Sequence, residues 1–217
     1  MKSKLKWIIG VVLLVIIIGV VGCFVLHKNS NNTLNQNDEP VRESKPSTEA
    51  IPNETKTLIV YYSLTSSTEK VATMLHDKIG GDIYEIEIYK TYPSVVSEVS
   101  AEAREERRTG NLPELKGELP SLDEYDLILV GGPVWSMTVC SPLMNYLKLT
   151  DFDGKNVVGF WTDDAQAGNY FNEFKNQVQN GNVLDGFGMS NVKSLSDDEI
   201  NDKLDSWISD IASLIEQ

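Results

Sequence analysis

The sequence is poor in the residues from which metal centres, disulfide frameworks and hydrolytic triads are built. Among its 217 residues there are only two cysteines, Cys23 and Cys140, and two histidines, His27 and His76. The cysteines lie in segments of unrelated pattern, so we expect neither a disulfide framework nor a thiolate metal site. Two isolated histidines supply no ligand set for zinc and no Ser-His-Asp triad. We therefore expect no metal site.

Positive charge is also scarce. The chain has 19 Lys and Arg residues against 32 Asp and Glu residues, which gives a formal net charge of −13. Proteins that bind nucleic acid need Lys and Arg to neutralise phosphates, so we expect no nucleic-acid partner. The length is typical of one domain with appendages.

One long hydrophobic run is present, near the N-terminus. Lysines at positions 2, 4 and 6 precede twenty uncharged, mostly apolar residues from Trp7 to Leu26. Such a run can span a membrane or act as a signal peptide. Residues 20–23, VVGC, also resemble the lipobox of bacterial lipoproteins, in which the cysteine is acylated, and this makes Cys23 the candidate lipidation site. We therefore predict a signal peptide or transmembrane anchor over residues 1–26.

The lysines before the run favour a cytoplasmic N-terminus, which places the rest of the chain on the outer face of the cytoplasmic membrane. Residues 27–55 follow, and they are rich in Asn, Ser, Thr, Glu and Pro without an apolar period. Such a segment cannot bury enough apolar surface to offset the entropy of ordering. We predict a disordered linker that tethers residues 56–217.

Residues 56–217 alternate short β-rich runs with longer helical patterns. Strands are predicted at 57–62, 83–89, 127–132, 156–161 and 182–189, and helices at 67–81, 94–110, 141–149, 169–181 and 196–217. Gly80 and Gly181 are expected to end helices, Ser196 and Glu199 to form a capping box, and Cys140 to start a helix as a small buried residue. Five βα units predict an α/β three-layer sandwich around a five-stranded parallel sheet.

A cluster of hydroxyl side chains follows the first predicted strand. Residues 63–69 read SLTSSTE and include Ser63, Thr65, Ser66, Ser67 and Thr68. At the start of a helix, backbone N–H groups and hydroxyls can bind an anion. No Lys or Arg lies between residues 57 and 68, and neither a P-loop nor a dinucleotide fingerprint is present. The remaining interpretations are a monophosphate held by neutral donors, or a helix-capping cluster without a ligand.

A second loop follows the third predicted strand and reads GGPVWSMTVCSPL. Its glycines allow close backbone approach, and Trp135 can either stack on a planar heterocycle or pack as a lid over the sheet. Together the two loops resemble those of the flavodoxin family: Ser63, Thr65 and Thr68 match an S-x-T-x-x-T phosphate loop, and residues 125–135, YDLILVGGPVW, match the strand and loop beside the flavin. Further matches are Tyr92-Pro93, residues 113–115 and residues 152–160.

This resemblance implies a flavodoxin-like fold that binds FMN. The phosphate would lie against Ser63, Thr65, Ser66, Ser67 and Thr68, and the isoalloxazine ring along Pro133, Val134, Trp135 and Ser136. Because the phosphate would be held without a neighbouring cation in an acidic chain, we expect a low reduction potential.

The loop after the fourth predicted strand departs from the family pattern. It reads TDDAQAGN, where relatives usually carry Thr-Ser-Gly-Gly, and it keeps Thr162 and Gly168 while introducing Asp163 and Asp164. Thr162, Asp163 and Gly168 are the candidate residues at the pyrimidine edge. The two carboxylates either oppose a reduced flavin there or point to solvent and cap the next helix. The functions that follow are FMN-dependent electron transfer or oxidoreductase activity, with no identified acid or base, or a non-catalytic surface module that has lost FMN.

Overall fold

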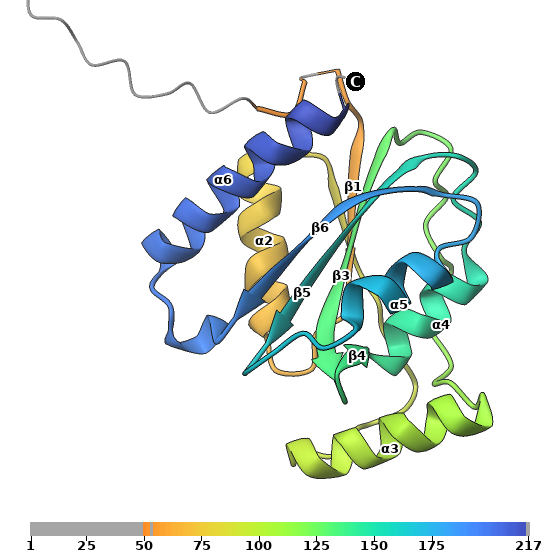
Figure 1. The fold of residues 1–217 in the computed structure, drawn as a ribbon. Helices are drawn as coiled ribbons and strands as arrows, with labels where there is room; N and C mark the ends of the chain where they lie inside the picture. Colours follow the sequence, from red (N-terminus) through yellow and green to blue (C-terminus); the bar gives the residue numbers. More distant parts are fainter. Residues whose placement is uncertain (1–49, 53, 216–217) are drawn as a thin grey trace, which may run out of the picture. The chain divides into compact units, whose positions relative to one another are not determined.

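The computed structural model describes residues 50–52 and 54–215 (Figure 1). In chain order its helices and strands are β1 (Thr57–Tyr61), α2 (Ser67–Ile79), β2 (Asp82–Glu85), α3 (Val96–Thr109), β3 (Leu127–Trp135), β4 (Thr138–Val139), α4 (Ser141–Leu149), β5 (Asn156–Asp163), α5 (Tyr170–Gln177), β6 (Asn182–Ser190), the short 3-10 helix η1 (Val192–Ser194) and α6 (Asp197–Ile215).

The predicted five-stranded parallel sheet is confirmed. Its strands run in the order β2-β1-β3-β5-β6, and each neighbouring pair is parallel. A sixth strand, β4, was not predicted; it folds back on the end of β3, pairing antiparallel so that Val134 lies opposite Val139. Its two residues are too few for any sequence pattern to mark.

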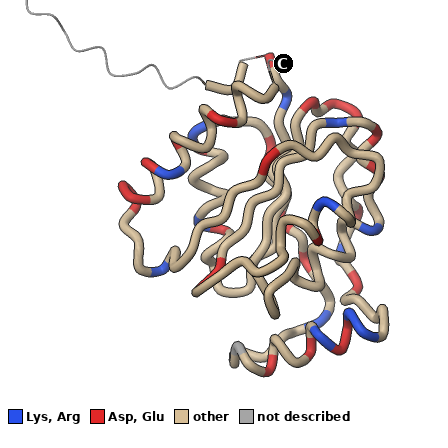
Figure 2. Tube along the Cα trace, viewed as in Figure 1, with Lys and Arg blue, Asp and Glu red and all other residues tan. Residues whose placement is uncertain are grey.

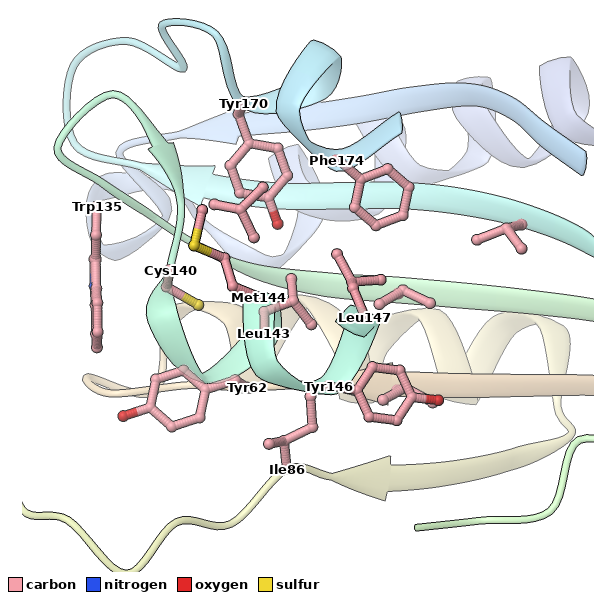
Figure 3. Close-up of a cluster of buried hydrophobic side chains, with 14 of the residues drawn as sticks. Tyr62, Ile86, Trp135, Cys140, Leu143, Met144, Tyr146, Leu147, Tyr170 and Phe174 are labelled. Atoms are coloured by element: carbon pink, nitrogen blue, oxygen red, sulfur yellow. The ribbon is translucent and has the colours of Figure 1, made fainter. Parts of the chain in front are cut away.

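Helices cover both faces of the sheet, which confirms the three-layer sandwich. On one face α2 and α6 enclose a buried cluster with Ile59, Leu129 and Trp207, while α4 and α5 pack on the other face with Val60, Tyr146 and Phe174. The first and third strands are buried along almost their whole length, as central parallel strands are. Figure 3 shows the buried cluster on the face covered by α4 and α5, into which α4 projects Leu143 and Leu147.

Two local predictions were wrong. The second strand ends at Glu85 rather than at Tyr89, because the chain leaves the sheet edge there and Ile88 instead bridges Leu115 in antiparallel fashion. The helix α5 ends at Gln177, where Val178 turns to extended backbone, so Gly181 does not end it. The capping box is confirmed: Ser196 N donates to Glu199 Oε2 at 2.8 Å, and Glu199 N donates to Ser196 Oγ at 3.3 Å. Gly80 also follows α2 directly, as expected.

The predicted anchor over residues 1–26, its lipidation site Cys23 and most of the predicted linker lie outside the described residues. Within the described part of the chain, no helix combines the length and apolar character needed to cross a membrane.

Candidate functional site

The site lies where the strand order of the sheet reverses. The chain goes from β1 to one side to form β2, and then returns past β1 to form β3 on the other side. The loops after β1 and β3 therefore diverge at the carboxyl ends of two adjacent strands, where open α/β sheets bind their ligands. A cavity of about 330 Å³ opens there, lined by Leu64, Thr65, Ser67, Tyr92, Pro93, Ser94, Val99, Ser100, Pro133, Val134, Trp135, Thr162, Asp163, Asp164 and Val192.

The loop after β1, residues 63–69, which we call the hydroxyl loop, presents hydrogen-bond donors that have no partner. Ser66 is the N-cap of α2 in a left-handed conformation, with φ of 62°, and its side chain makes no capping hydrogen bond. Thr65 and Ser67 line the cavity on either side of it. The Oγ atom of Ser63 is buried without a hydrogen-bond partner. Since buried polar groups are normally paired, this loop fits an anion at the N-terminus of α2.

Thr68 takes a different position from the other hydroxyl residues. Its side chain is buried, and its Oγ1 lies 2.8 Å from Oγ1 of Thr162 at the end of β5. Thr162 lines the cavity, whereas Thr68 does not. Thr68 thus links the loop after β1 to the loop after β5, residues 162–169, which we call the third loop.

Trp135 closes the far side of the cavity at the end of β3. Its side chain is only 7% exposed and meets two tyrosine rings edge to face: Tyr62 with ring centroids 5.7 Å apart and Tyr92 at 4.7 Å. Figure 3 shows the indole at the edge of the buried cluster that also contains Cys140 and Tyr62. Trp135 therefore both packs on the sheet end and lines the cavity, so the two interpretations of this residue are compatible.

Ser136, also predicted to lie along the ring, is turned toward α3 instead. It and Met137 form the tip of the β3–β4 hairpin, both with positive φ, of 51° and 68°. The Oγ of Ser136 donates to the carbonyl oxygen of Ser100 at 3.0 Å. Ser136 is not among the residues that line the cavity.

Gly168 likewise supports the site from outside. It has a φ of +61°, and a Cβ atom placed on it would lie 2.5 Å from the carbonyl oxygen of Met137. The next residue, Asn169, donates its N–H to that same oxygen at 2.9 Å. The glycine is thus required for the third loop to pack on the hairpin tip.

The two aspartates of the third loop both line the cavity. Asp163 is partly buried, and its Oδ1 accepts a hydrogen bond from Ser190 Oγ at 2.9 Å. Asp164 is exposed. No Lys, Arg or His is among the lining residues in the described part of the chain, so the site is acidic.

Sequence reasoning missed one wall of the cavity. Tyr92, Pro93 and Ser94 come from the loop after β2, and Val99 and Ser100 come from α3. The Tyr92-Pro93 pair matches the family pattern, and its position in the loop after a parallel strand is the signal that could have assigned it to the site.

Cys140 is not a redox group of this site. It is fully buried and precedes α4 as its N-cap residue, as expected. Burial raises the pKa of its thiol to about 12, so the thiol stays protonated and unreactive near neutral pH.

A family model described as Flavodoxin matches residues 56–211, and no curated protein matches. Among solved structures, a flavoprotein from Lactobacillus acidophilus NCFM in complex with FMN is 25% identical, with a TM-score of 0.57, over 69% of this chain and 98% of that one. A protein from Bacteroides uniformis, provisionally assigned as a flavoprotein, is 26% identical, with a TM-score of 0.59, over 71% and 97%.

A third structure, from Bacteroides eggerthii and also provisionally assigned as a flavoprotein, is 22% identical with a TM-score of 0.61, over 75% of this chain and 99% of that one. That likeness supports the fold alone.

Proposed function

Because this chain belongs to the flavodoxin family, we propose that it is an FMN-dependent electron-transfer protein, held at the outer face of the cytoplasmic membrane by its N-terminal segment. FMN is its cofactor. The family match covers residues 56–211, which include every residue of the cavity. The electron donor and acceptor belong to partners outside this chain.

One observation carries the proposal: hydroxyl residues of the loop after β1, Thr65 and Ser67, line the same cavity as the indole of Trp135. Ser63 Oγ is buried without a partner, and the N-terminus of α2 is uncapped by side chains, so this end suits a phosphate. Trp135 and Pro133 line the other side, which suits the flat isoalloxazine ring. The distribution of polar and aromatic groups in the cavity matches a flavin mononucleotide.

The residues of this chain bind and shield rather than react. Bound FMN supplies the capacity to accept and release electrons. The loop hydroxyls would hold the phosphate by neutral hydrogen bonds, while Trp135 and Val134 keep water from one side of the ring. Asp163 and Asp164 add negative charge at the cavity, which makes each added electron less favourable.

The first test is flavin binding by the purified full-length chain. We expect a yellow protein with one FMN per chain, reduced and reoxidised reversibly under anaerobic conditions, with a midpoint potential below that of free FMN. A colourless protein that leaves the fluorescence of added FMN unchanged would instead support a binding module that has kept the fold and lost the cofactor.

The proposed location has its own test. Mass spectrometry of the mature N-terminus would give a diacylglyceryl-modified Cys23 for a lipid anchor and an intact Met1 for a membrane-spanning helix. Recovery of the full-length chain in the soluble fraction without detergent would contradict both forms of attachment.

A further inference from the structure

A buried ionic cluster lies directly behind the cavity wall. Glu106, on the inner side of α3, is the one buried carboxylate in the part of the chain that the structure describes, with 7% of its surface exposed. It accepts hydrogen bonds from the hydroxyl of Tyr92, at 3.0 Å to Oε1 and 2.8 Å to Oε2. The ammonium group of Lys90 bonds to Oε1 of Glu106 and also lies 2.7 Å from Oε2 of Glu102.

Tyr92 connects this cluster to the cavity. Its ring lines the cavity and packs edge to face on Trp135, with centroids 4.7 Å apart and planes at 70°. On another side, the Nζ of Lys90 lies 4.6 Å from the centroid of the Tyr92 ring, a cation–π contact. Glu106 and Lys90 are therefore each one side chain away from the cavity.

The ammonium group of Lys90 keeps its proton in this cluster. Burial opposes the charged form of Lys90, but its hydrogen bonds to Glu102 and Glu106 outweigh burial and raise the pKa of the ammonium group. Burial, and then the hydrogen bond to Glu106, raise the pKa of Tyr92, so its hydroxyl stays a donor. The phenol is thus committed to Glu106, and the ring is fixed against Trp135.

Burying a carboxylate is costly unless it is paired, and a structural role alone would be served as well by apolar residues. Figure 2 shows acidic and basic residues mixed along α3, and most of them are exposed. Among the charged residues of α3, Glu106 alone is buried, and it bonds to Tyr92, the one tyrosine that lines the cavity in the described part of the chain.

We propose that Glu106 and Lys90 form a tuning pair for the flavin site: together they orient Tyr92 against Trp135, and their opposite charges set the reduction potential of bound FMN. Both are positioning residues, since neither lines the cavity. This inference rests on the proposed function. Its distinctive consequence is that the two charges act in opposite directions on the same flavin.

The test compares variants of the full-length chain by redox titration of bound FMN. Glu106→Gln removes a negative charge with little change in shape, so the midpoint potential is expected to rise. Lys90→Met removes the positive charge and keeps most of the stem volume, so the potential is expected to fall. The double variant restores the balance of charge, and its potential is expected to return toward that of the parent chain.

Two controls separate charge from packing. Glu105→Gln makes the same chemical change one residue earlier, at an exposed side chain paired with Arg108, and is expected to leave the potential unchanged. Tyr92→Phe removes the hydroxyl without changing charge; it is expected to weaken FMN binding severalfold, with only a small change in potential. Trp135 fluorescence of the FMN-free protein, with Trp135→Phe as the reference, reports whether Tyr92 has moved.

The outcomes divide cleanly. Opposite shifts that cancel in the double variant support the tuning pair. If Glu106→Gln and Lys90→Met bind FMN but leave its potential unchanged, or shift it in the same direction, the pair only packs and the inference is wrong. If Lys90→Met does not fold, a Glu106→Gln potential equal to that of Glu105→Gln is enough to overturn it. If the parent chain binds no FMN, the proposed function fails first and this inference fails with it.

Discussion

The Oγ1 atoms of Thr68 and Thr162 lie 2.8 Å apart, although the two residues are separated by 94 positions in the sequence. Thr68 is in the first turn of α2, and Thr162 is near the end of β5. Both are buried. This single hydrogen bond joins the hydroxyl loop, where the phosphate would bind, to the acidic third loop.

Replacing Thr68 by Val should therefore affect both stability and cofactor binding. The Thr162 hydroxyl would be left buried without its partner, which costs about 1–2 kcal/mol of unfolding free energy. We expect weaker FMN binding as well, because the two loops are no longer tied. Urea denaturation and FMN fluorescence titration measure the two effects. Thr68→Ser, which keeps the hydroxyl, is the matched control.

The double variant Thr68→Val/Thr162→Val makes the decisive comparison. Replacing both partners by apolar groups of the same shape leaves no unsatisfied hydroxyl, so its loss of stability should be smaller than the sum of the single losses. Strict additivity would show that the two hydroxyls do not interact.

The phosphate loop can be tested by changing the ligand. We expect Thr65→Ala and Ser67→Ala each to weaken FMN binding by about tenfold, since a hydrogen bond to a charged group contributes about 1.5 kcal/mol or more. Riboflavin, which lacks the phosphate, should lose almost nothing. Parallel fluorescence titrations with both ligands measure the ratio. Equal losses for FMN and riboflavin would mean that these hydroxyls support the ring end and not the phosphate.

Asp164 tests the influence of the acidic third loop. It lines the cavity and is exposed, so Asp164→Asn removes a negative charge with little structural cost. We expect a higher midpoint potential, by an amount equivalent to about 0.5–1 kcal/mol at low salt, and a smaller difference at high salt because of screening. Asp210→Asn, on the outer side of α6, is the control and should leave the potential unchanged. An equal effect from both changes would point to net charge alone.

Gly168 and Gly154 form a matched pair for the hairpin contact. Both have positive φ, but only at Gly168 would a Cβ atom collide, 2.5 Å from the carbonyl oxygen of Met137, whereas nothing lies within 4 Å at Gly154. We expect Gly154→Ala to cost about 1 kcal/mol of unfolding free energy and Gly168→Ala about 1–2 kcal/mol more. FMN binding should weaken only in Gly168→Ala. Equal losses in denaturation experiments would show that the hairpin simply moves aside.

Stability is expected to fall at alkaline pH because of Cys140. The fully buried thiol has a pKa of about 12 in the folded chain, against an ordinary value of 9.0. Between these values the unfolded chain has lost the proton that the folded chain keeps, so stability is complete below pH 9 and declines above it. At pH 10.5 the loss from this group is about 2 kcal/mol.

Urea midpoints of the parent chain and Cys140→Ala, measured at pH 8 and pH 10.5, check this expectation. The variant should show the smaller decline, while buried tyrosines such as Tyr62 and Tyr92, whose pKa values are also raised by burial, contribute the remainder. Identical declines in the two proteins would exclude the thiol as a source.

The sheet was predictable because its strands carry local signals. The apolar runs of β1 and β3 and the helices between strands specify a parallel order with few alternatives. The second strand was predicted too long, since the apolar residues Ile86 and Ile88 continue its pattern although the strand ends at Glu85 and Ile88 bridges Leu115. An alternating pattern indicates which face a residue points to, but not whether a neighbouring strand is present.

The site was predictable only where it follows strands. Thr65, Ser67, Pro133, Val134, Trp135, Thr162 and Asp163 were placed at strand ends from the sequence, and all of them line one cavity. The wall formed by Tyr92, Val99 and Ser100 depends on how α3 docks, and this is a matter of tertiary packing. Nor could the sequence show that Ser136 would bond to α3 or that Gly168 would pack on the hairpin tip, because both follow from the geometry of the hairpin.

The hairpin tip has one more consequence for the molecule. Ser136 is hydrogen-bonded to Ser100 of α3, and Met137 is hydrogen-bonded to Asn169 of the third loop. Two elements that border the cavity, α3 and the third loop, are thus both held by the hairpin tip. We therefore expect α3 and the third loop to shift together when either is displaced.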